Sequence, residues 1–373
     1  MLARAVFWGS GAGILWTHAG YPLTAAALAR LRTRPVARGD VEPTVSLIVA
    51  AHNEEGSIEG RVENALSLDY PAEKLEIVVA SDGSTDRTDE VVEALAAREP
   101  RVRLVRCPRG GKLAAINHVW PQTSGEILAF SDATSRWEPD ALRLLVRNFA
   151  DPQVSYVSGR LVWERSDGTS RESTYWRYEN LVRASESAFG SITGGVGPIY
   201  AVRREDFVTQ PYGQDAALPA LMVQRGRRAV FDPEAVAREK PAATMEAEYG
   251  RKARMFTWSW YQLLAGTPTR GVDPLFRFAW FSHRTLRYGS GLLHIALLAS
   301  SLALAPKRRV YRTALAAQLA CLSLAAAGRL RAPVPGASLA YYYVLVSAAT
   351  VAGLLRYARG GVPRTWERAE GTR

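Results

Sequence analysis

Cysteine is scarce in this sequence, with only Cys107 and Cys321 among 373 residues. One precedes a proline and the other lies in a distant apolar run, so neither a disulfide framework nor a cysteine-based metal site accounts for the fold. This content is compatible with a reducing compartment. Histidine is also rare, and His52 and His118 have no partner at metal-ligand spacing. Both histidines are therefore interpreted as structural.

Acidic residues are fewer than basic ones, 36 against 47, which leaves a net charge of +11. Such an excess of positive charge is typical of proteins that bind nucleic acid, an anionic membrane or an anionic substrate. Much of it lies beside apolar stretches, at residues 30–34, 307–309 and 356–359. That placement is typical of membrane-flanking charge. Membrane lipids are therefore expected as partners, and nucleic acid is not.

Four apolar stretches indicate how the chain meets a membrane. Residues 6–28 are long enough for a spanning helix of about 20 residues, whereas the apolar part of a cleaved signal peptide is usually about 7 to 15 residues. We expect a retained anchor over 1–34 and a cytoplasmic domain after it. Residues 289–305, 313–327 and 339–355 predict two or three C-terminal membrane helices within 289–357, before a basic tail over 358–373. Three spans would put that tail outside, so a re-entrant or interfacial stretch is left open. The expected location is the inner cell membrane, with several spans.

Between residues 43 and 240, short apolar runs alternate with amphipathic segments. Expected strands are 45–51, 75–80, 102–105 and 127–130, with a weaker one at 199–202. One expected helix follows residues 53–55 and ends at residue 66. The other expected helices cover 86–97, 112–119, 139–149 and 171–186. This alternation predicts a doubly wound α/β fold. Residues 249–264 and 275–288 mix arginines with aromatic residues, which predicts amphipathic helices at the membrane interface within 241–288.

Three acidic motifs follow one another along the chain, at residues 81–86, 131–134 and 214–215. The first two come directly after predicted buried strands. Ligands of open α/β sheets bind outside the carboxyl ends of such strands, so the aspartates are expected to converge on one pocket. An isolated aspartate at such a junction would more simply cap the next helix.

The motif series as a whole resembles membrane-bound family 2 glycosyltransferases. The resemblance rests on residues 50–55, 81–86, 110–112 and 131–134 and continues through 157–160, 194–203, 214–215, 232–235 and 251–255. Any one of these motifs is weak evidence for the family, but the series of motifs in this order is specific to it. The resemblance implies a GT-A fold, a doubly wound, Rossmann-like mixed sheet, and inverting transfer of a sugar from a nucleotide-diphosphate donor.

The resemblance also assigns residues to the donor. Asp82 corresponds to the aspartate that contacts the nucleotide base. Lys112 follows two glycines at a helix start, where backbone N–H groups and a mobile charge suit phosphate. Asp132 corresponds to a ligand of Mg²⁺ or Mn²⁺, although Thr134 stands where many relatives carry a second aspartate. Metal-independent action, with arginine or lysine in place of the ion, is therefore left open. Three further donor-binding residues are implied: Ala51, Asn53 and Glu54.

Later motifs point to the acceptor and to catalysis. Asp215 corresponds to the general base that takes the proton of the acceptor hydroxyl, while Gln214 replaces the usual first carboxylate. Arg251 and Arg254 suit the leaving diphosphate, and Arg254 aligns with the arginine of the Gln-x-x-Arg-Trp signature. The glutamine and tryptophan of that signature are absent, which argues against processive synthesis. Membrane contact is the other interpretation for Lys252. Gly194, Gly195 and Trp176 are candidates for the acceptor region.

The function expected from these residues is inverting glycosyl transfer at the cytoplasmic membrane face. The expected partners are a UDP- or GDP-sugar and a lipid-linked or polysaccharide acceptor. Two alternatives remain open. A nucleotidyl or phosphosugar transferase would need the same phosphate cradle and metal, and an inactive nucleotide-binding membrane scaffold would be consistent with Thr134 and Gln214.

Overall fold

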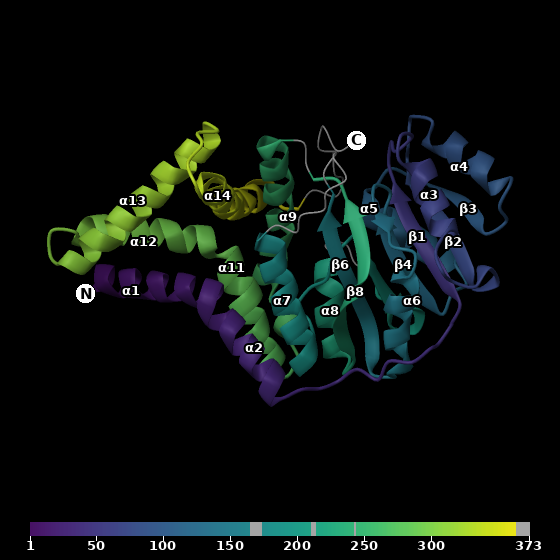
Figure 1. The fold of residues 1–373 in the computed structure, drawn as a ribbon, viewed down its shortest axis with the longest axis horizontal. Coiled ribbons are helices and arrows are strands. Elements are labelled where there is room, and N and C mark those ends of the chain that lie inside the picture. Colours follow the sequence, from purple (N-terminus) through teal and green to yellow (C-terminus); the bar gives the residue numbers. More distant parts are fainter. Residues whose placement is uncertain (165–173, 210–213, 242–243, 363–373) are drawn as a thin grey trace.

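The computed structural model describes residues 1–164, 174–209, 214–241 and 244–362, without the side chains of residues 174, 175, 214–216 and 267. A sheet flanked by helices forms one end of the molecule, and long helices from both ends of the chain form the other (Figure 1). Three helices lie between these two parts: α7 (Thr174–Phe189), α8 (Gln214–Gln224) and α9 (Met245–Ala265).

A single mixed sheet has the order β3-β2-β1-β4-β7-β6-β8-β5. Its strands are β1 (Val45–Ala51), β2 (Leu75–Asp82), β3 (Val102–Cys107), β4 (Ile127–Asp132), β5 (Arg136–Trp137), β6 (Val154–Trp163), β7 (Tyr200–Arg203) and β8 (Arg228–Glu239). Strands β1 to β4 are mutually parallel, β7 is antiparallel to both β4 and β6, and β8 is parallel to β6. The carboxyl ends of β1, β2, β4, β6 and β8 therefore meet at one edge.

Both faces of the sheet are covered, as a doubly wound fold requires. On one face Leu47 and Ile77 pack with helices α3 (Ile58–Leu66), α4 (Thr88–Ala96) and α6 (Ala141–Val146). On the other, Ile48 and Phe130 pack with α5 (Lys112–Val119) and α8. Side chains of neighbouring strand residues point to opposite faces, which is why Leu47 and Ile48 belong to different cores. Short 3₁₀ turns complete this part: Ala72–Lys74, Trp120–Gln122, Arg147–Ala150, Arg204–Asp206 and Thr267–Thr269.

Strands β6 and β8 were not predicted. Charged residues interrupt the apolar pattern of β8, and their partners come from distant parts of the chain. Asp232, which is fully buried, accepts hydrogen bonds from the Arg147 guanidinium at 3.0 Å and from Asn148 Nδ2 at 2.8 Å. These tertiary contacts make charge tolerable inside the strand, and no local pattern reveals them.

The predicted N-terminal anchor is one helical run with a change of geometry inside it. Helix α1 (Leu2–Leu15) leads into a π-helical turn (Trp16–Gly20) and then α2 (Tyr21–Leu31). Helix α1 lies along α12 (Ser290–Leu304), whereas α2 packs on α7 (Figure 1). Tyr21 and Ala25 are fully buried there. The second half of the expected anchor is thus partly covered by protein.

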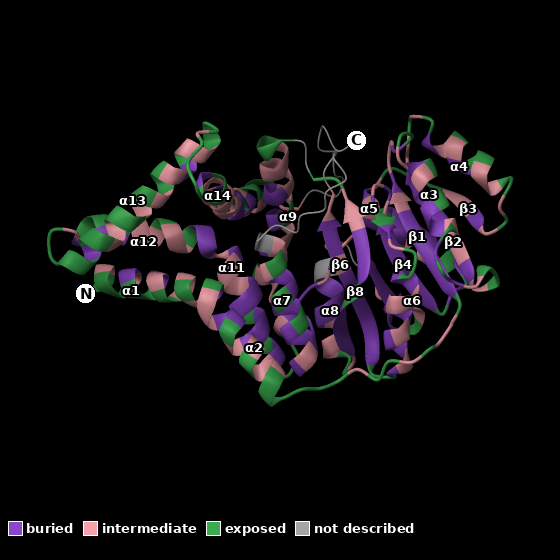
Figure 2. Cartoon of the chain, viewed as in Figure 1, coloured by how far each residue is buried: buried purple, intermediate pink, exposed green. Residues whose placement is uncertain are grey.

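Two C-terminal helices of the described chain are long and apolar enough to cross a membrane: α13 (Arg309–Arg329) and α14 (Ala337–Gly360). Helix α12 is apolar but shorter. Most exposed large apolar side chains come from residues 1–31 and 292–355, and none comes from the described residues 32–164. Figure 2 shows this contrast between the buried strands and the exposed surfaces of α1 and α13. Such an apolar surface favours lipid contact.

The two expected interface segments are helical. The first is α9, and the second consists of α10 (Pro274–Trp280), a π-helical turn (Phe281–Thr285) and α11 (Leu286–Tyr288). Many of their aromatic side chains nevertheless face protein. Phe256, Trp260, Phe276 and Trp280 are all buried. Packing, and not lipid contact, accounts for these four positions.

Candidate functional site

Two adjoining cavities open where the carboxyl ends of the strands meet. The sheet pocket, of about 480 Å³, is lined by the loops after β1 and β4 and the end of β8, including Ala50, His52, Glu54, Asp132, Thr134, Ser135, Glu239, Arg251 and Arg254. The helix pocket, of about 300 Å³, lies among α7, α9 and α11 and includes Lys112, Asp132, Trp176, Gly195, Glu239, Arg251, Lys252, Arg284 and Arg287. Asp132, Glu239 and Arg251 line both pockets, so these residues mark their junction.

Asp132 and Lys112 lie together at the carboxyl edge of the sheet. Asp132 is the last residue of β4, and Lys112 is the first of α5, after Gly111 with φ of +93°. A side chain at that φ would be strained, so glycine is needed to start the helix there. The Lys112 ammonium forms an ion pair with Asp132. A phosphate at this point would meet the lysine and the positive end of α5.

Glu239 is a site residue that the sequence reasoning missed. It ends β8, lines both pockets and accepts a hydrogen bond from the Ser135 hydroxyl. Burial, followed by the charge of Asp132, raises the pKa of Glu239 to about 7. Glu239 is thus, like Asp132, at the junction of the two pockets. Its strand was not recognised, so nothing in the sequence placed it at this edge.

Asp82 has a different environment from the one expected. Its carboxylate accepts hydrogen bonds from the backbone N–H groups of Gly110, at 2.7 Å, and Gly111, at 2.9 Å, and from the Arg109 guanidinium. It is 2 % exposed and is not among the residues lining the sheet pocket or the helix pocket. The carboxylate therefore holds the glycine loop ahead of Lys112, and base contact stays a prediction.

Some of the residues at the end of β1 and after it line the sheet pocket, and others hold the loops or the core together. Glu54 lines the sheet pocket and accepts a hydrogen bond from Ser57 at 2.5 Å. Asn53 has φ of +54°, and its Oδ1 accepts a hydrogen bond from the Thr85 N–H at 2.8 Å, which ties this loop to the one after β2. Ala51 packs in the core, while Ala50 lines the pocket. A donor could meet Ala51 only through its backbone.

The two predicted arginines of α9 both reach the sheet pocket. Arg251 pairs with Glu248 at 2.8 Å, and its guanidinium lies 5.6 Å from the ring centroid of Trp163. The pKa of Arg251 is raised because Glu248 outweighs the effect of burial. Arg254 lines the same pocket. Lys252 is buried and lines the helix pocket, so the alternative of contact with the membrane surface is wrong for its side chain.

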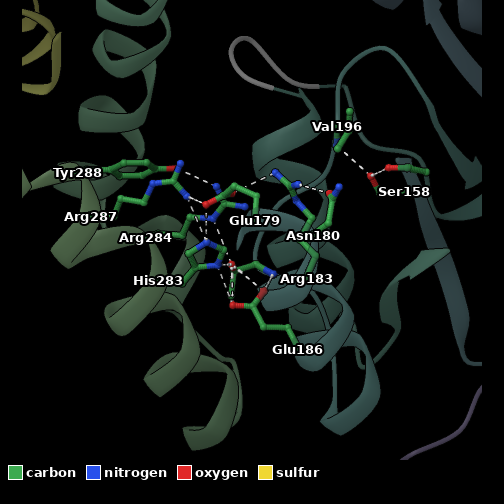
Figure 3. Close-up of polar contacts among 12 residues, drawn as sticks. Ser158, Glu179, Asn180, Arg183, Glu186, Val196, His283, Arg284, Arg287 and Tyr288 are labelled. Carbon is green, nitrogen blue, oxygen red and sulfur yellow. Dashed lines mark hydrogen bonds and ion pairs between the residues drawn. The ribbon is translucent and has the colours of Figure 1, made fainter. Parts of the chain in front are cut away.

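A buried charge network joins α7 to the turn before α11, and some of its members line the helix pocket (Figure 3). Glu179 and Glu186 of α7 face His283, which is 3.5 Å from Glu179 and 2.8 Å from Glu186. Burial lowers the pKa of His283, but the two carboxylates outweigh it and raise the pKa above its ordinary value. Burial also raises the pKa of Glu179, yet His283 and Arg183 bring it down to about 2. The carboxylates are thus held charged by neighbouring cations.

The predicted acceptor-region residues lie on this pocket or beside it. Trp176 and Gly195 line it. A Cβ on Gly194 would lie 2.1 Å from Arg284 Nη2, and a Cβ on Gly195 would lie 1.8 Å from the Tyr156 hydroxyl. Both glycines therefore make room for buried side chains, which explains the pair without a ligand. Asp215 is the second residue of α8, and its side chain lies outside the described part of the chain.

The residues present fit a divalent cation held jointly with a substrate. Within the described ranges, no group of three or more His, Cys, Asp or Glu side chains could hold a metal ion. Mg²⁺ in nucleotide sites commonly uses one or two carboxylates and takes its other ligands from phosphates and water. Asp132 and Glu239, which both line the two pockets, could supply such a pair, and after burial the charge of Asp132 contributes to the raised pKa of Glu239. A cation between them would relieve that repulsion.

Comparison with known proteins gives one family model and several relatives. Residues 46–209 match the model described as Glycosyl transferase family 2. A β-monoglucosyldiacylglycerol synthase of Synechocystis sp. is 31% identical over 52% of this chain and 42% of its own length. An N-acetylglucosaminyltransferase of Rhizobium meliloti is 28% identical over 68% of this chain and 63% of its own. The chain thus spans less than two thirds of the length of either relative.

A solved structure supports the fold over nearly the whole chain. The mannosyltransferase PcManGT of Pyrobaculum calidifontis, in complex with GDP-Man and Mn²⁺, has a TM-score of 0.75 and 24% sequence identity. The similarity covers 96% of this chain and 99% of that one. The mixed sheet and the arrangement of helices around it are therefore those of a GT-A fold.

Proposed function

We propose that the chain is an inverting glycosyltransferase, on the premise of the match of residues 46–209 to the model described as Glycosyl transferase family 2. It moves a sugar from a nucleotide-diphosphate donor to a lipid-linked or polysaccharide acceptor. The observation that carries the proposal is the meeting of two pockets at Asp132, Glu239 and Arg251. In this assignment the sheet pocket holds the donor, the helix pocket holds the acceptor, and transfer occurs where they join.

The donor assignment follows from charge at the junction. A nucleotide diphosphate bears negative charge that grows on the leaving oxygen during transfer, and Lys112, Arg251 and the positive end of α5 are cationic groups around that position. Arg254 assists from the sheet pocket. PcManGT, which has the same fold, was solved with GDP-Man. We therefore favour a GDP- or UDP-sugar as the donor.

Asp132, together with Glu239, is the proposed holder of Mg²⁺ or Mn²⁺. When bound, the cation neutralises charge on the leaving diphosphate. PcManGT was solved with Mn²⁺. The Lys112 ammonium, which forms an ion pair with Asp132, would turn from this carboxylate to the phosphates once the cation is in place.

Transfer is a single displacement. The acceptor hydroxyl oxygen forms a bond to the anomeric carbon as the bond from that carbon to the diphosphate oxygen breaks, and the nucleoside diphosphate leaves. Asp215 is the proposed general base that accepts the hydroxyl proton. Gln214 beside it adds no second negative charge, so nothing at this position raises the pKa of the base by like-charge repulsion.

The membrane setting completes the proposal. Helices α13 and α14 are apolar enough to span a membrane, and α1 and α12 expose apolar side chains beside them. The relative from Synechocystis is named for a diacylglycerol product. We propose a multi-pass protein of the inner cell membrane with its sheet domain in the cytoplasm, where nucleotide sugars are made.

A donor panel tests this function. Membranes containing the full-length protein are given UDP- and GDP-sugars with Mn²⁺, Mg²⁺ or a chelator, and nucleoside diphosphate release is measured. At least one donor should release nucleoside diphosphate, and Asp132→Asn should lower that rate about 100-fold or more, as loss of one active-site electrostatic group does. Asp40→Asn is the matched control, because the Asp40 side chain is 88% exposed. Release of pyrophosphate instead would indicate nucleotidyl transfer and overturn the proposal.

A further inference from the structure

The helix pocket holds more positive than negative charge. Six basic side chains line it: Lys112, Arg183, Arg251, Lys252, Arg284 and Arg287. Three acidic ones do so: Asp132, Glu179 and Glu239. Burying this excess of cations is costly unless an anion accompanies them. The pocket therefore has the electrostatic character of an anion site.

Several of these cations already have carboxylate partners. Glu179 pairs with Arg287 and, at 3.3 Å, with Arg183. Glu248, just outside the pocket, pairs with Arg251 at 2.8 Å and lies 3.9 Å from Lys252. These pairs fix the side chains in place. They leave Arg284 as the cation to be explained.

Arg284 has no ion pair with a carboxylate among the described residues. Its Nε donates to the Thr193 hydroxyl at 3.1 Å and its Nη1 to the Tyr288 hydroxyl at 3.4 Å, while Nη2 has no hydrogen-bond partner. The residue is 8 % exposed. An unsatisfied buried donor costs about 1–3 kcal/mol, more when it is charged. A bound anion would remove that cost.

Arg183, on the facing helix α7, also keeps an unsatisfied donor among the described residues, although it pairs with Glu179. It is 4 % exposed, its guanidinium lies 5.5 Å from the ring centroid of Trp176, and its Nε has no hydrogen-bond partner. Two buried guanidinium groups, from α7 and from the turn before α11, thus line one cavity, and each has one buried N–H donor without a partner among the described residues. A planar guanidinium with free donors is the group best suited to phosphate oxygens.

The pocket also lies next to a candidate membrane span. Trp258, Ser259 and Gln262 of α9 line it. The same helix packs against α14, with Phe256 and Trp260 in one cluster with Ala349. A molecule held in the pocket therefore lies close to the helices that would meet lipid.

We propose that the helix pocket binds the phosphate or diphosphate group of a lipid-linked acceptor, with Arg284 and Arg183 as its ligands. The inference rests on the proposed function and names its acceptor class: a lipid that carries phosphate next to the sugar or alcohol whose hydroxyl attacks. The pocket shares Asp132 and Glu239 with the sheet pocket. A hydroxyl linked to the bound phosphate thus faces the donor.

Binding of simple lipid phosphates tests the inference without a donor. Full-length protein in detergent micelles is titrated with farnesyl diphosphate, farnesyl phosphate, farnesol and inorganic pyrophosphate, with quenching of tryptophan fluorescence as the readout. Farnesyl diphosphate or farnesyl phosphate should bind at least about 10-fold more tightly than farnesol and than pyrophosphate. Farnesol binding as tightly as the phosphates would overturn the anion site. Equal binding of pyrophosphate would show a site for free diphosphate and overturn the lipid assignment.

Variants locate the site. Arg284→Gln should weaken binding of the tighter farnesyl phosphate about 10-fold or more, the loss expected for one charge-assisted hydrogen bond. Arg183→Gln should do the same independently, and Arg284→Lys should restore part of the affinity. Arg277→Gln, at an exposed arginine seven residues earlier in the same helical run, should bind as the unchanged protein does. Unchanged affinity in both glutamine variants would overturn the assignment. Release of nucleoside diphosphate from donors, measured separately, tests the proposed function by itself.

Discussion

Replacing Gly195 by alanine should strain the wall of the helix pocket. The added Cβ would lie 1.8 Å from the hydroxyl oxygen of Tyr156 and 2.8 Å from its Cζ. An ordinary carbon–oxygen contact is roughly 3.3 Å, so one group must move by about 1.5 Å. Tyr156 is fully buried, and its ring stacks on Tyr200 with 5.5 Å between centroids. Movement of either ring would therefore disturb packed neighbours.

The expected cost is that of overpacking a rigid core. Such insertions lower the free energy of unfolding by about 1–3 kcal/mol. Because this overlap is deep, Gly195→Ala is expected to lower it by about 3 kcal/mol. At about 2 °C per kcal/mol for a chain of this size, the thermal midpoint should fall by about 6 °C. Gly190→Ala is the matched control. Nothing lies within 4 Å of a Cβ at Gly190, so that midpoint should stay within about 1 °C.

A double-mutant cycle makes the test specific. Tyr156→Phe removes the oxygen at 1.8 Å and leaves the ring carbon at 2.8 Å, so alanine at position 195 should cost at least about 1 kcal/mol less in the phenylalanine background. The assay is thermal unfolding of full-length protein in detergent, followed by tryptophan fluorescence. Equal midpoints for Gly195→Ala and Gly190→Ala, or no coupling to Tyr156→Phe, would refute the reasoning.

Two further substitutions test the charged parts of the site. The pKa of Glu239 is raised from 4.5 to about 7. Between these pH values the folded state keeps a proton that the unfolded state has lost. The free energy of unfolding therefore falls by up to about 3 kcal/mol as pH rises through this range. Glu239→Gln should lose less stability than the unchanged protein between pH 5 and pH 8 in thermal unfolding, and parallel losses would contradict the assignment. Tyr21 donates to Glu186 at 2.7 Å inside the contact of α2 with α7; Tyr21→Phe should therefore cost about 1.5–3 kcal/mol. Tyr341→Phe, which removes none of the hydrogen bonds described, serves as its control, and equal midpoints would show that this bond contributes nothing.

The parallel half of the sheet was predictable because its strands are continuous apolar runs. The runs 45–51, 75–80 and 127–130 correspond to β1, β2 and β4, which are buried on both faces. Strand β8 was missed because Asp232 and Arg238 break the pattern. Arg147 lies 85 residues from Asp232 in the sequence, and Glu138 lies 100 residues from Arg238. Each pair becomes neighbours only after folding. Glu239 was missed with its strand.

Some residues of the candidate site were also predictable from the sequence, and others come together only in the folded chain. Lys112 and Asp132 lie next to elements that were predicted from the sequence, and they form an ion pair. Glu179 and Arg183 share α7, but His283 lies about 100 residues away, and no spacing within the sequence links it to them. The aromatic residues of α9 suggested a membrane interface, yet Phe256 and Trp260 are buried against α14. Composition identifies an apolar side chain but not whether lipid or protein covers it.

Product analysis tests the central claim most directly. A donor that releases nucleoside diphosphate is incubated with full-length protein and a lipid acceptor, and the anomeric proton of the product is measured by NMR. The account predicts one new glycosidic bond per nucleoside diphosphate released, with an anomeric configuration opposite to that of the donor. A product that keeps the donor configuration, or release of pyrophosphate without a glycosidic bond, would contradict it.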